Sequence, residues 1–155
     1  MEKVPEIKKR PATKEDEDTA RNIHHSAYHD VIVRQYGSWD DSMQDDFFNN
    51  EWSPEKYKII LSGESISGYC SIEHNADHIF VHELVLSPDF QGKGIGSKVL
   101  EELIEESKRE NIPIKLRVLK ENQAQYLYRR LGFKDTGSTN SHFQMEFNPG
   151  PSALE

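Results

Sequence analysis

The feature that most constrains the fold is a buried strand that runs through a glycine-rich turn directly into a helix. The apolar run Ile79–Leu86 predicts a central strand, which residues 87–89 end. Glycines alternate from Gly92 to Gly96, and a helix is predicted over residues 94–110. Alternating glycines expose backbone N–H groups to one concave space at a helix N-terminus, where the helix dipole favours an anion. The turn therefore predicts a binding site for a phosphate or pyrophosphate.

Two familiar phosphate-binding motifs do not fit this turn. A Walker A loop has four residues between its glycines and ends in Gly-Lys-Ser or Gly-Lys-Thr, an order that residues 92–97 lack. A dinucleotide-binding fingerprint has Gly-x-Gly-x-x-Gly after the first strand of a βαβ unit, whereas these glycines lie in the middle of the chain. Both nucleotide-binding folds are therefore excluded. A helix entry that needs glycine only for its turn is the structural alternative.

Length and charge limit the class of protein and its partners. The chain has 155 residues, which fits one domain, predicted over residues 1–147 with a flexible C-terminal tail over residues 148–155. Its 19 Lys and Arg residues are outnumbered by 27 Asp and Glu residues, so the formal net charge is −8. Nucleic-acid phosphates require a basic surface, so no nucleic acid is expected as a partner, whereas a basic small molecule is.

Cysteine content and hydropathy indicate the compartment. Cys70 is the single cysteine, which excludes an internal disulfide and a multi-cysteine zinc site and agrees with a reducing cytoplasm. No stretch approaches the ~20 apolar residues of a membrane helix. Residues 1–5 lack the apolar core of a signal peptide. We therefore expect a soluble, cytoplasmic protein with no membrane partner.

Hydrophobic periodicity and turn residues predict the remaining elements. Helices are predicted at residues 13–35, within 38–54 and at 122–131, and strands at residues 7–10, 57–61, 65–73, 114–119, 133–136 and 142–147. This order mixes antiparallel strands early in the chain with a strand-helix-strand-helix unit late in the chain. The predicted fold class is α/β (α+β), with a single mixed, mostly antiparallel central sheet of about 6–7 strands flanked by about four helices.

Two motifs resemble those of the GNAT superfamily of acyl-CoA-dependent N-acetyltransferases. The first is Gln91-Gly92-Lys93-Gly94-Ile95-Gly96, which matches that family's Gln/Arg-x-x-Gly-x-Gly/Ala signature for the CoA pyrophosphate. The second is Asn122-Gln123-Ala124-Gln125-Tyr126-Leu127-Tyr128-Arg129-Arg130-Leu131-Gly132-Phe133, which is similar to the family's Asn-x-x-Ala-x-x-Leu-Tyr-x-x-x-Gly-Phe segment. The resemblance covers about residues 7–147 and implies a GNAT-like acyl-CoA N-acyltransferase fold.

The resemblance also implies where each part of acetyl-CoA binds. The pyrophosphate is expected on the loop formed by Gln91, Gly92, Lys93, Gly94, Ile95, Gly96 and Ser97. The backbone of Leu84, Val85 and Leu86 is expected to hold the pantetheine arm and the thioester oxygen. Such backbone donors are fixed before the oxyanion develops. Asn122 is expected to contact the pantetheine arm, and Tyr128 is expected beside the sulfur.

The implied function is that of an acetyl-CoA-dependent N-acetyltransferase. The acetyl group would pass by direct transfer in a ternary complex to a primary amine of a small molecule or peptide. Acetyl-CoA is the expected cosubstrate, and no metal is expected. The expected partner is a small amine-bearing acceptor, and a homodimer is compatible with the sequence. A non-catalytic acyl-CoA-binding sensor module with the same fold is the alternative.

Three residues are candidates for the chemistry. Tyr128 is the predicted general acid, because a phenol with an ordinary pKa of about 10 can protonate a thiolate leaving group. His82 and Glu83 interrupt the apolar strand and point to opposite faces, so only one of them faces a given cleft. His82 is favoured as the base, since an ordinary pKa near 6.5 suits removal of an ammonium proton. Glu83 is the candidate to bind the acceptor's charge, or to be the base instead.

The acceptor is expected among four aromatic side chains of the irregular segment, Trp39, Phe47, Phe48 and Trp52, with the strand at residues 142–143 on the other side. Aromatic faces attract a cation, and so do the four aspartates nearby, Asp40, Asp41, Asp45 and Asp46. The alternative is that these rings cap the core beneath the first helices, since aromatics on short helices usually pack.

Two histidines have the spacing of metal ligands. His25 and His29 are four residues apart, so a helix places them on one face, as two ligands of a zinc site require. No third ligand is apparent nearby in the sequence. The interpretation we favour is therefore a polar helix face that borders the acceptor site.

Overall fold

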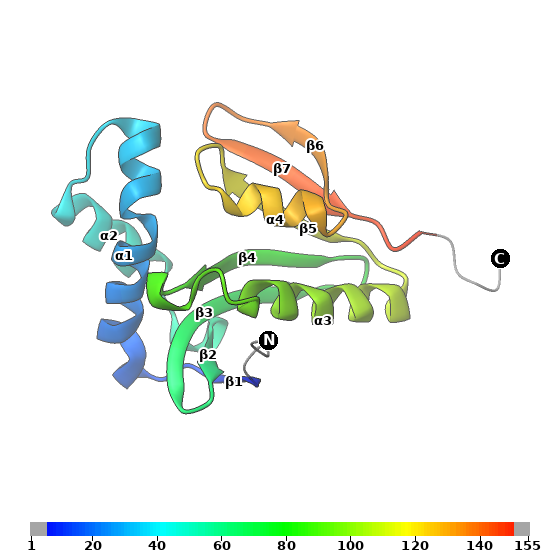
Figure 1. Ribbon diagram of the computed structural model, residues 1–155, viewed down its shortest axis with the longest axis horizontal. Coiled ribbons are helices and arrows are strands. Elements are labelled where there is room, and N and C mark those ends of the chain that lie inside the picture. The colour runs from blue at the N-terminus through cyan, green and yellow to red at the C-terminus, as the bar shows by residue number, and fades with distance from the viewer. Residues whose placement is uncertain (1–5, 151–155) are drawn as a thin grey trace. The chain divides into compact units, whose positions relative to one another are not determined.

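A computed structural model describes residues 6–150 of the protein (Figure 1). Residues 1–5, where a signal peptide was not expected, lie outside the described residues, as do residues 151–155 of the predicted tail. Residues 148–150 carry no regular secondary structure. No helix in the described part of the chain is both long enough and apolar enough to cross a membrane.

Seven strands form one mixed sheet. They are β1 (Ile7–Pro11), β2 (Lys58–Ser62), β3 (Ser65–His74), β4 (Ile79–Leu86), β5 (Ile114–Leu119), β6 (Lys134–Ser138) and β7 (His142–Phe147), in the order β1-β2-β3-β4-β5-β7-β6. The pairs β1·β2, β2·β3, β5·β7 and β6·β7 are antiparallel, and β4·β5 is parallel. The predicted mixed, mostly antiparallel sheet is confirmed.

Four α-helices accompany the sheet, as predicted. They are α1 (Glu17–Tyr36), α2 (Asp41–Glu51), α3 (Ile95–Glu110) and α4 (Ala124–Arg130), with short 3-10 turns η1 (Lys14–Asp16), η2 (Pro54–Lys56) and η3 (Pro88–Phe90). α1 ends at Gly37, whose φ of 92° lies in the left-handed region that glycine tolerates. The predicted strands at residues 79–86 and 114–119 have the observed bounds. The predicted first helix begins too early, because η1 precedes the first α-helical turn.

Contacts divide the chain into two units, which are described separately. Among the described residues, the first unit comprises residues 6–71 and 83–96, and the second comprises residues 72–82 and 97–150. The first therefore holds β1, β2, α1, α2 and the glycine turn, and the second holds β5, β6, β7 and α4. β3 and β4 contribute residues to both units.

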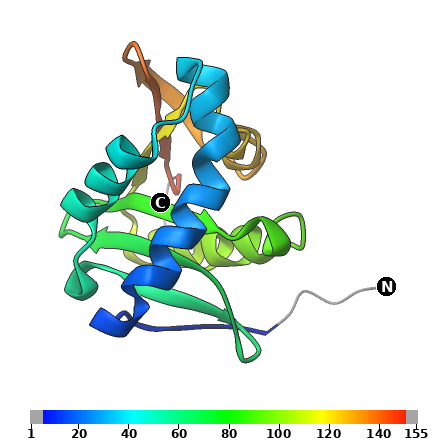
Figure 2. The same ribbon diagram turned by 90° about the vertical axis from the view of Figure 1, so that its left-hand side faces the viewer.

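The first unit is built around one buried cluster that is rich in aromatic rings. Its members are Ala12, Ala20, Ile23, Phe48, Trp52, Tyr57, Ile59, Tyr69 and Val85. α2 runs beside α1 and contributes Phe48 (Figure 2). The ring centroid of Trp52 lies 4.7 Å from that of Tyr57 and 5.9 Å from that of Tyr69. Large rings in contact bury much apolar area, so this cluster fixes α1 and α2 on the strands of their own unit.

The second unit follows the periodicity expected from its sequence. α3 buries Val99, Leu100 and Leu103 on one face and exposes glutamates on the other. β5 alternates, with Ile114, Leu116 and Val118 buried and the residues between them exposed or partly exposed. These apolar faces supply the core of this unit.

A buried aspartate organises the entry into α1. Asp16 accepts a hydrogen bond from the backbone N–H of Thr13 at 2.8 Å, as in a capping box. The Arg10 guanidinium also binds both carboxylate oxygens of Asp16, at 2.8 and 2.9 Å. The hydrogen bonds from Arg10 hold the pKa of Asp16 at about 2, below the ordinary value of 3.8. β1 is thereby tied to the start of α1.

We expect Asp16→Asn to lower the free energy of unfolding at pH 7 by about 1–2 kcal/mol, because it removes a cap and a charge-assisted hydrogen bond. The folded-state pKa of Asp16 is depressed, so its contribution is complete above pH 4–5 and is lost as the pH falls towards 2. Urea unfolding at pH 7, 4 and 3 should show the difference from wild type shrinking with pH. Asp18→Asn is the matched control, since Asp18 is exposed and pairs only at the surface with Arg21. An equal loss from both variants would contradict the prediction.

Candidate functional site

The glycine turn has the backbone geometry of an anion site. Gly92 and Gly94 have φ values of 74° and 84°, both left-handed, and α3 begins immediately afterwards at Ile95. The Gln91 side chain donates from Nε2 to the backbone carbonyl of Leu86 at 2.9 Å, which ties the turn to the end of β4. The first amides of a helix have no intrahelical acceptor. The turn thus combines fixed N–H donors with the positive end of the α3 dipole.

The end of β4 extends beyond its pairing with β5. The parallel register joins Ile79, Phe80 and Val81 of β4 to residues 114–116 of β5 and ends there. β4 itself continues to Leu86. The segment at residues 84–86, where the sequence predicted backbone contacts to the pantetheine arm, therefore lies past the part of β4 that pairs with β5.

The sequence analysis missed a close approach between β3 and β4. Opposite β2, the register of β3 shifts, so that Ser67 is an extra residue next to Gly68. An ideal Cβ on Gly68 would lie 2.0 Å from the backbone oxygen of Val85 and 3.0 Å from the Cα atom of Leu86. Only glycine fits there. An isolated glycine inside a predicted strand was the available signal.

The Glu83 side chain lies next to an aromatic residue of the first unit. The Tyr57 hydroxyl donates to Oε1 of Glu83 at 3.2 Å. Burial, and after it the charge of Glu83, raises the pKa of Tyr57 and that of Tyr69 above the ordinary value of 10. Both phenols therefore stay protonated. The half-buried Glu83 carboxylate thus accepts a hydrogen bond from a phenol, Tyr57, that stays protonated.

His82 has a different environment, as strand alternation predicts. Val81 and Val85 are buried on the Glu83 side, whereas the His82 side chain is 47% exposed. Nε2 of His82 lies 2.8 Å from Oε1 of Glu73, and this contact lowers the pKa of Glu73. His82 is thus engaged in a surface pair with a carboxylate.

The second motif places a buried tyrosine on α4. Tyr128 is 7% exposed, and burial raises its pKa to about 12. Its ring packs 5.7 Å from that of Phe133, whereas Tyr126 is exposed on another face of the helix. The two tyrosines therefore lie on different faces of α4.

Two observations bear on Asn122, the residue predicted to contact the pantetheine arm. Its Oδ1 accepts a hydrogen bond from the backbone N–H of Ala124 at 2.9 Å, so the side chain stabilises the start of α4. Counted back from Tyr128, the family pattern also has its Asn seven residues earlier, where this chain has Glu121. The predicted pantetheine contact of Asn122 stays a prediction, with a structural role beside it.

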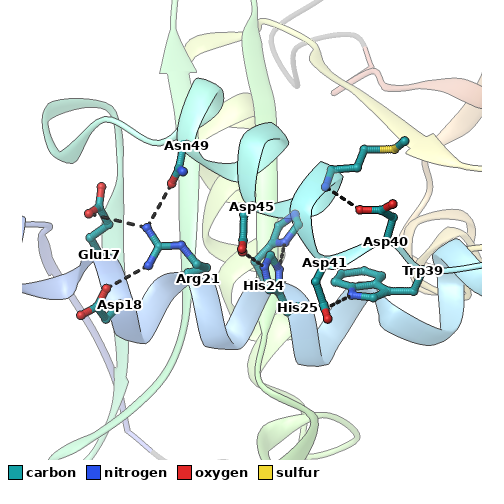
Figure 3. Close-up of polar contacts among 11 residues, drawn as sticks. Glu17, Asp18, Arg21, His24, His25, Trp39, Asp40, Asp41, Asp45 and Asn49 are labelled. Carbon is teal, nitrogen blue, oxygen red and sulfur yellow. Dashed lines mark hydrogen bonds and ion pairs between the residues drawn. The ribbon is translucent and has the colours of Figure 1, made fainter.

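The four aromatic residues of the irregular segment do not form one group. Phe48 and Trp52 belong to the buried cluster, so the core alternative holds for them. Phe47 is 57% exposed. Trp39 packs against the rings of His25 and His29, with centroids 5.1 and 5.3 Å away, and its indole N–H donates to Asp41 (Figure 3). An acceptor pocket lined by all four rings is therefore wrong.

The two histidines considered as metal ligands have carboxylate partners instead. Nε2 of His25 lies 2.7 Å from Oδ1 of Asp45 (Figure 3). Nδ1 of His29 lies 3.1 Å from Oδ1 of Asp30. Within residues 6–150, no three or more His, Cys, Asp or Glu side chains are grouped as metal ligands. Cys70 is buried, and burial raises its pKa.

A family profile described as "Acetyltransferase (GNAT) family" matches residues 20–133. The matched segment includes both the glycine turn and the α4 motif. A search of curated protein sequences found no match.

Solved structures of similar fold include several acetyltransferases. PaiA N-acetyltransferase from Thermoplasma acidophilum, in complex with coenzyme A, is 20% identical, with a TM-score of 0.74 over 92% of this chain and 99% of that one. The ribosomal-protein-S18-alanine N-acetyltransferase from Escherichia coli is 19% identical, with a TM-score of 0.64 over 96% and 97% of the two chains. Ard1 from Thermoplasma volcanium is 15% identical, with a TM-score of 0.60 over 94% and 99%. At these identities the likeness concerns the fold.

Proposed function

Because the chain belongs to the acetyltransferase (GNAT) family, we propose that it transfers the acetyl group of acetyl-CoA to a primary amine of a small molecule or peptide, by direct transfer in a ternary complex. The observation that carries the proposal is the glycine turn. Gly92 and Gly94 are both left-handed immediately before α3. A glycine turn of this kind at a helix N-terminus supports binding of an anion such as a pyrophosphate. Bound there, acetyl-CoA supplies the activated acetyl group.

Backbone groups do most of the cosubstrate binding in this proposal. The amides from Gln91 to Ser97 hold the pyrophosphate, and the backbone of residues 84–86 holds the pantetheine arm and the thioester oxygen. The hydrogen bond from Gln91 to Leu86 supports both roles, since it links the turn to that strand segment. Donors fixed by the fold need no reorganisation when negative charge develops on the thioester oxygen.

Glu83 is the base we propose, in place of the favoured His82. An amine attacks only when neutral, and a primary ammonium group with an ordinary pKa of about 10 must first lose a proton. The Glu83 carboxylate has aromatic neighbours and a hydrogen bond from Tyr57, an environment that attracts an ammonium group. His82, by contrast, is half-exposed and paired with Glu73.

Tyr128 is the proposed general acid. A pKa of about 12 keeps its hydroxyl protonated throughout the physiological range. The hydroxyl is therefore able to give a proton to the departing thiolate and to regain one from water afterwards. The assignment rests on the family motif together with the burial of this tyrosine.

The test of the function is release of free CoA thiol from acetyl-CoA in the presence of an amine panel. The panel should hold monoamines, diamines and peptides, including one that begins with alanine because of the similar alanine N-acetyltransferase fold. Amine-dependent release supports the proposal. Acetyl-CoA binding without release under any amine would indicate the sensor alternative, and absence of both would overturn the proposal.

We expect Gly94→Asp to weaken acetyl-CoA binding by at least about tenfold, measured by calorimetry, because it adds a side chain and a negative charge at the anion site. Gly63→Asp is the matched control. Gly63 is also left-handed, with φ of 60°, and lies in the turn between β2 and β3 with open space around it. Backbone strain alone would affect both variants alike. Equal affinity of wild type and Gly94→Asp would contradict the placement of the pyrophosphate.

A further inference from the structure

Tyr57 is the residue immediately before β2, and both its backbone and its ring are fixed by the first unit. Its backbone N–H donates to the carbonyl of Pro54 at 3.3 Å, and its carbonyl accepts from the N–H of Ala12 at 3.1 Å. Its ring centroid lies 4.7 Å from that of Trp52 and 5.6 Å from that of Tyr69. The side chain is buried, so the direction of its hydroxyl is set by the fold.

This hydroxyl donates to Oε1 of Glu83 at 3.2 Å. Burial, and after it the charge of Glu83, raises the pKa of Tyr57 above the ordinary value of 10. The phenol therefore stays a hydrogen-bond donor and is not able to act as the base itself. A carboxylate offers about four lone-pair positions. One hydrogen bond from Tyr57 thus leaves Glu83 able to accept from an ammonium group as well.

The titratable groups that act on this pair from the neighbouring elements are acids and phenols. Burial, and then the charges of Glu83 and of Tyr28 on α1, raise the pKa of Tyr69 on β3. Glu51 at the end of α2 adds a small contribution to the raised pKa of Tyr57. Groups of this kind are neutral or negative, so their charge does not favour the ionised form of Glu83. The hydrogen bond from Tyr57 does, because it is made to the carboxylate.

Tyr69 is a second phenol of the same cluster, and it differs from Tyr57 in one contact. Both rings are buried, and the charge of Glu83 acts on both hydroxyl groups. The Tyr69 hydroxyl, however, has no hydrogen-bond partner among residues 6–150. Proximity to Glu83 and burial are thus common to the two tyrosines, whereas the hydrogen bond to its carboxylate belongs to Tyr57.

We propose that Tyr57 is the positioning residue for Glu83, holding its carboxylate in one orientation and in the ionised form that accepts a proton from the acceptor amine; this inference rests on the proposed function. Partial burial of a carboxyl group favours the neutral acid, which is unable to take that proton, and the hydrogen bond opposes this effect. In the transfer, an N–H bond of the ammonium group breaks as an O–H bond of Glu83 forms. Glu83 then gives the proton to water, and nothing is oxidised or reduced.

The first test is Tyr57→Phe, with Tyr69→Phe as the matched control, since each removes one buried hydroxyl and keeps the ring. We expect Tyr57→Phe to lower kcat by about tenfold with unchanged acetyl-CoA affinity, and to move the acidic limb of the kcat/KM profile up by about one pH unit. Tyr69→Phe should stay within a few-fold of wild type, with the limb in place. In a Glu83→Gln background, Tyr57→Phe should have no further effect on turnover. An unmoved limb in Tyr57→Phe, or a further loss in that background, would overturn the positioning role.

A second measurement does not depend on turnover. The ¹³C shift of the Glu83 carboxyl group, followed against pH, should show a higher titration midpoint in Tyr57→Phe than in wild type or Tyr69→Phe, and thermal unfolding would verify that each variant is folded. Equal midpoints would overturn the positioning role. The two hypotheses fail in different ways. If the positioning role alone is wrong, the wild type still acetylates an amine, whereas if the proposed function is wrong, no amine in the panel releases CoA even though the midpoint moves.

Discussion

Alanine at Gly68 is expected to lower the free energy of unfolding by about 3 kcal/mol or more and to weaken acetyl-CoA binding. The added Cβ would lie 2.0 Å from the carbonyl oxygen of Val85 and 3.0 Å from the Cα atom of Leu86. Both atoms belong to the backbone, so no side-chain rotation relieves the clash. β3 and β4 must separate, and the segment at residues 84–86 that we propose for the pantetheine arm must move with them.

Gly137→Ala is the matched control for this prediction. Gly137 also lies in a strand without a left-handed φ, but an added Cβ would meet only Oε1 of Gln144 at 2.6 Å, the far end of a flexible side chain. Its expected cost is below about 1 kcal/mol. Urea unfolding measures the stability of both variants, and calorimetry measures their affinity for acetyl-CoA. Similar stabilities of the two variants would contradict the close approach of β3 and β4.

Glu83→Gln is expected to lower turnover by about 10²- to 10⁴-fold, the range for loss of a general base. Glutamine keeps the size of the side chain and is still able to accept the hydrogen bond from Tyr57. It lacks the charge that holds an ammonium group and the basicity that removes its proton. Steady-state kinetics with the best amine of the panel would measure the effect, and thermal unfolding would verify that the fold is retained.

His82→Ala is the control for Glu83, because the two residues are neighbours on β4 with opposite orientations. We expect His82→Ala to stay within a few-fold of the wild-type turnover, since it removes a half-exposed side chain and its pair with Glu73. A large loss from His82→Ala, with little change from Glu83→Gln, would return the role of base to His82.

The sequence by itself determined the features that depend on neighbouring residues. The strand at residues 79–86, the glycine turn and the helix after it follow from an apolar run, from residues that tolerate left-handed backbone and from helical periodicity. The capping interaction between Thr13 and Asp16 spans three residues and is local in the same sense. Local signals of this kind also sufficed for the family resemblance, because its two motifs are short continuous segments.

Tertiary structure decided what depends on residues far apart in the chain. Sequence alternation showed that His82 and Glu83 face opposite sides, but it did not show that Tyr57, from another strand end, meets Glu83. Whether each of the four aromatic rings lies in the core or at the surface depends on how α2 packs. The sequence is the same for either arrangement, so it did not decide between them.

The contact between Asp45 and His25 and the close approach at Gly68 also depend on residues that are far apart in the sequence. Asp45 lies 20 residues from His25, and only the packing of α2 beside α1 brings them together. Strand periodicity alone does not show that the backbone carbonyl of Val85 lies against Gly68. Backbone dihedrals and periodicity are local properties and can be inferred from sequence, whereas hydrogen bonds, clashes and burial between distant residues are set by the packing of the folded chain.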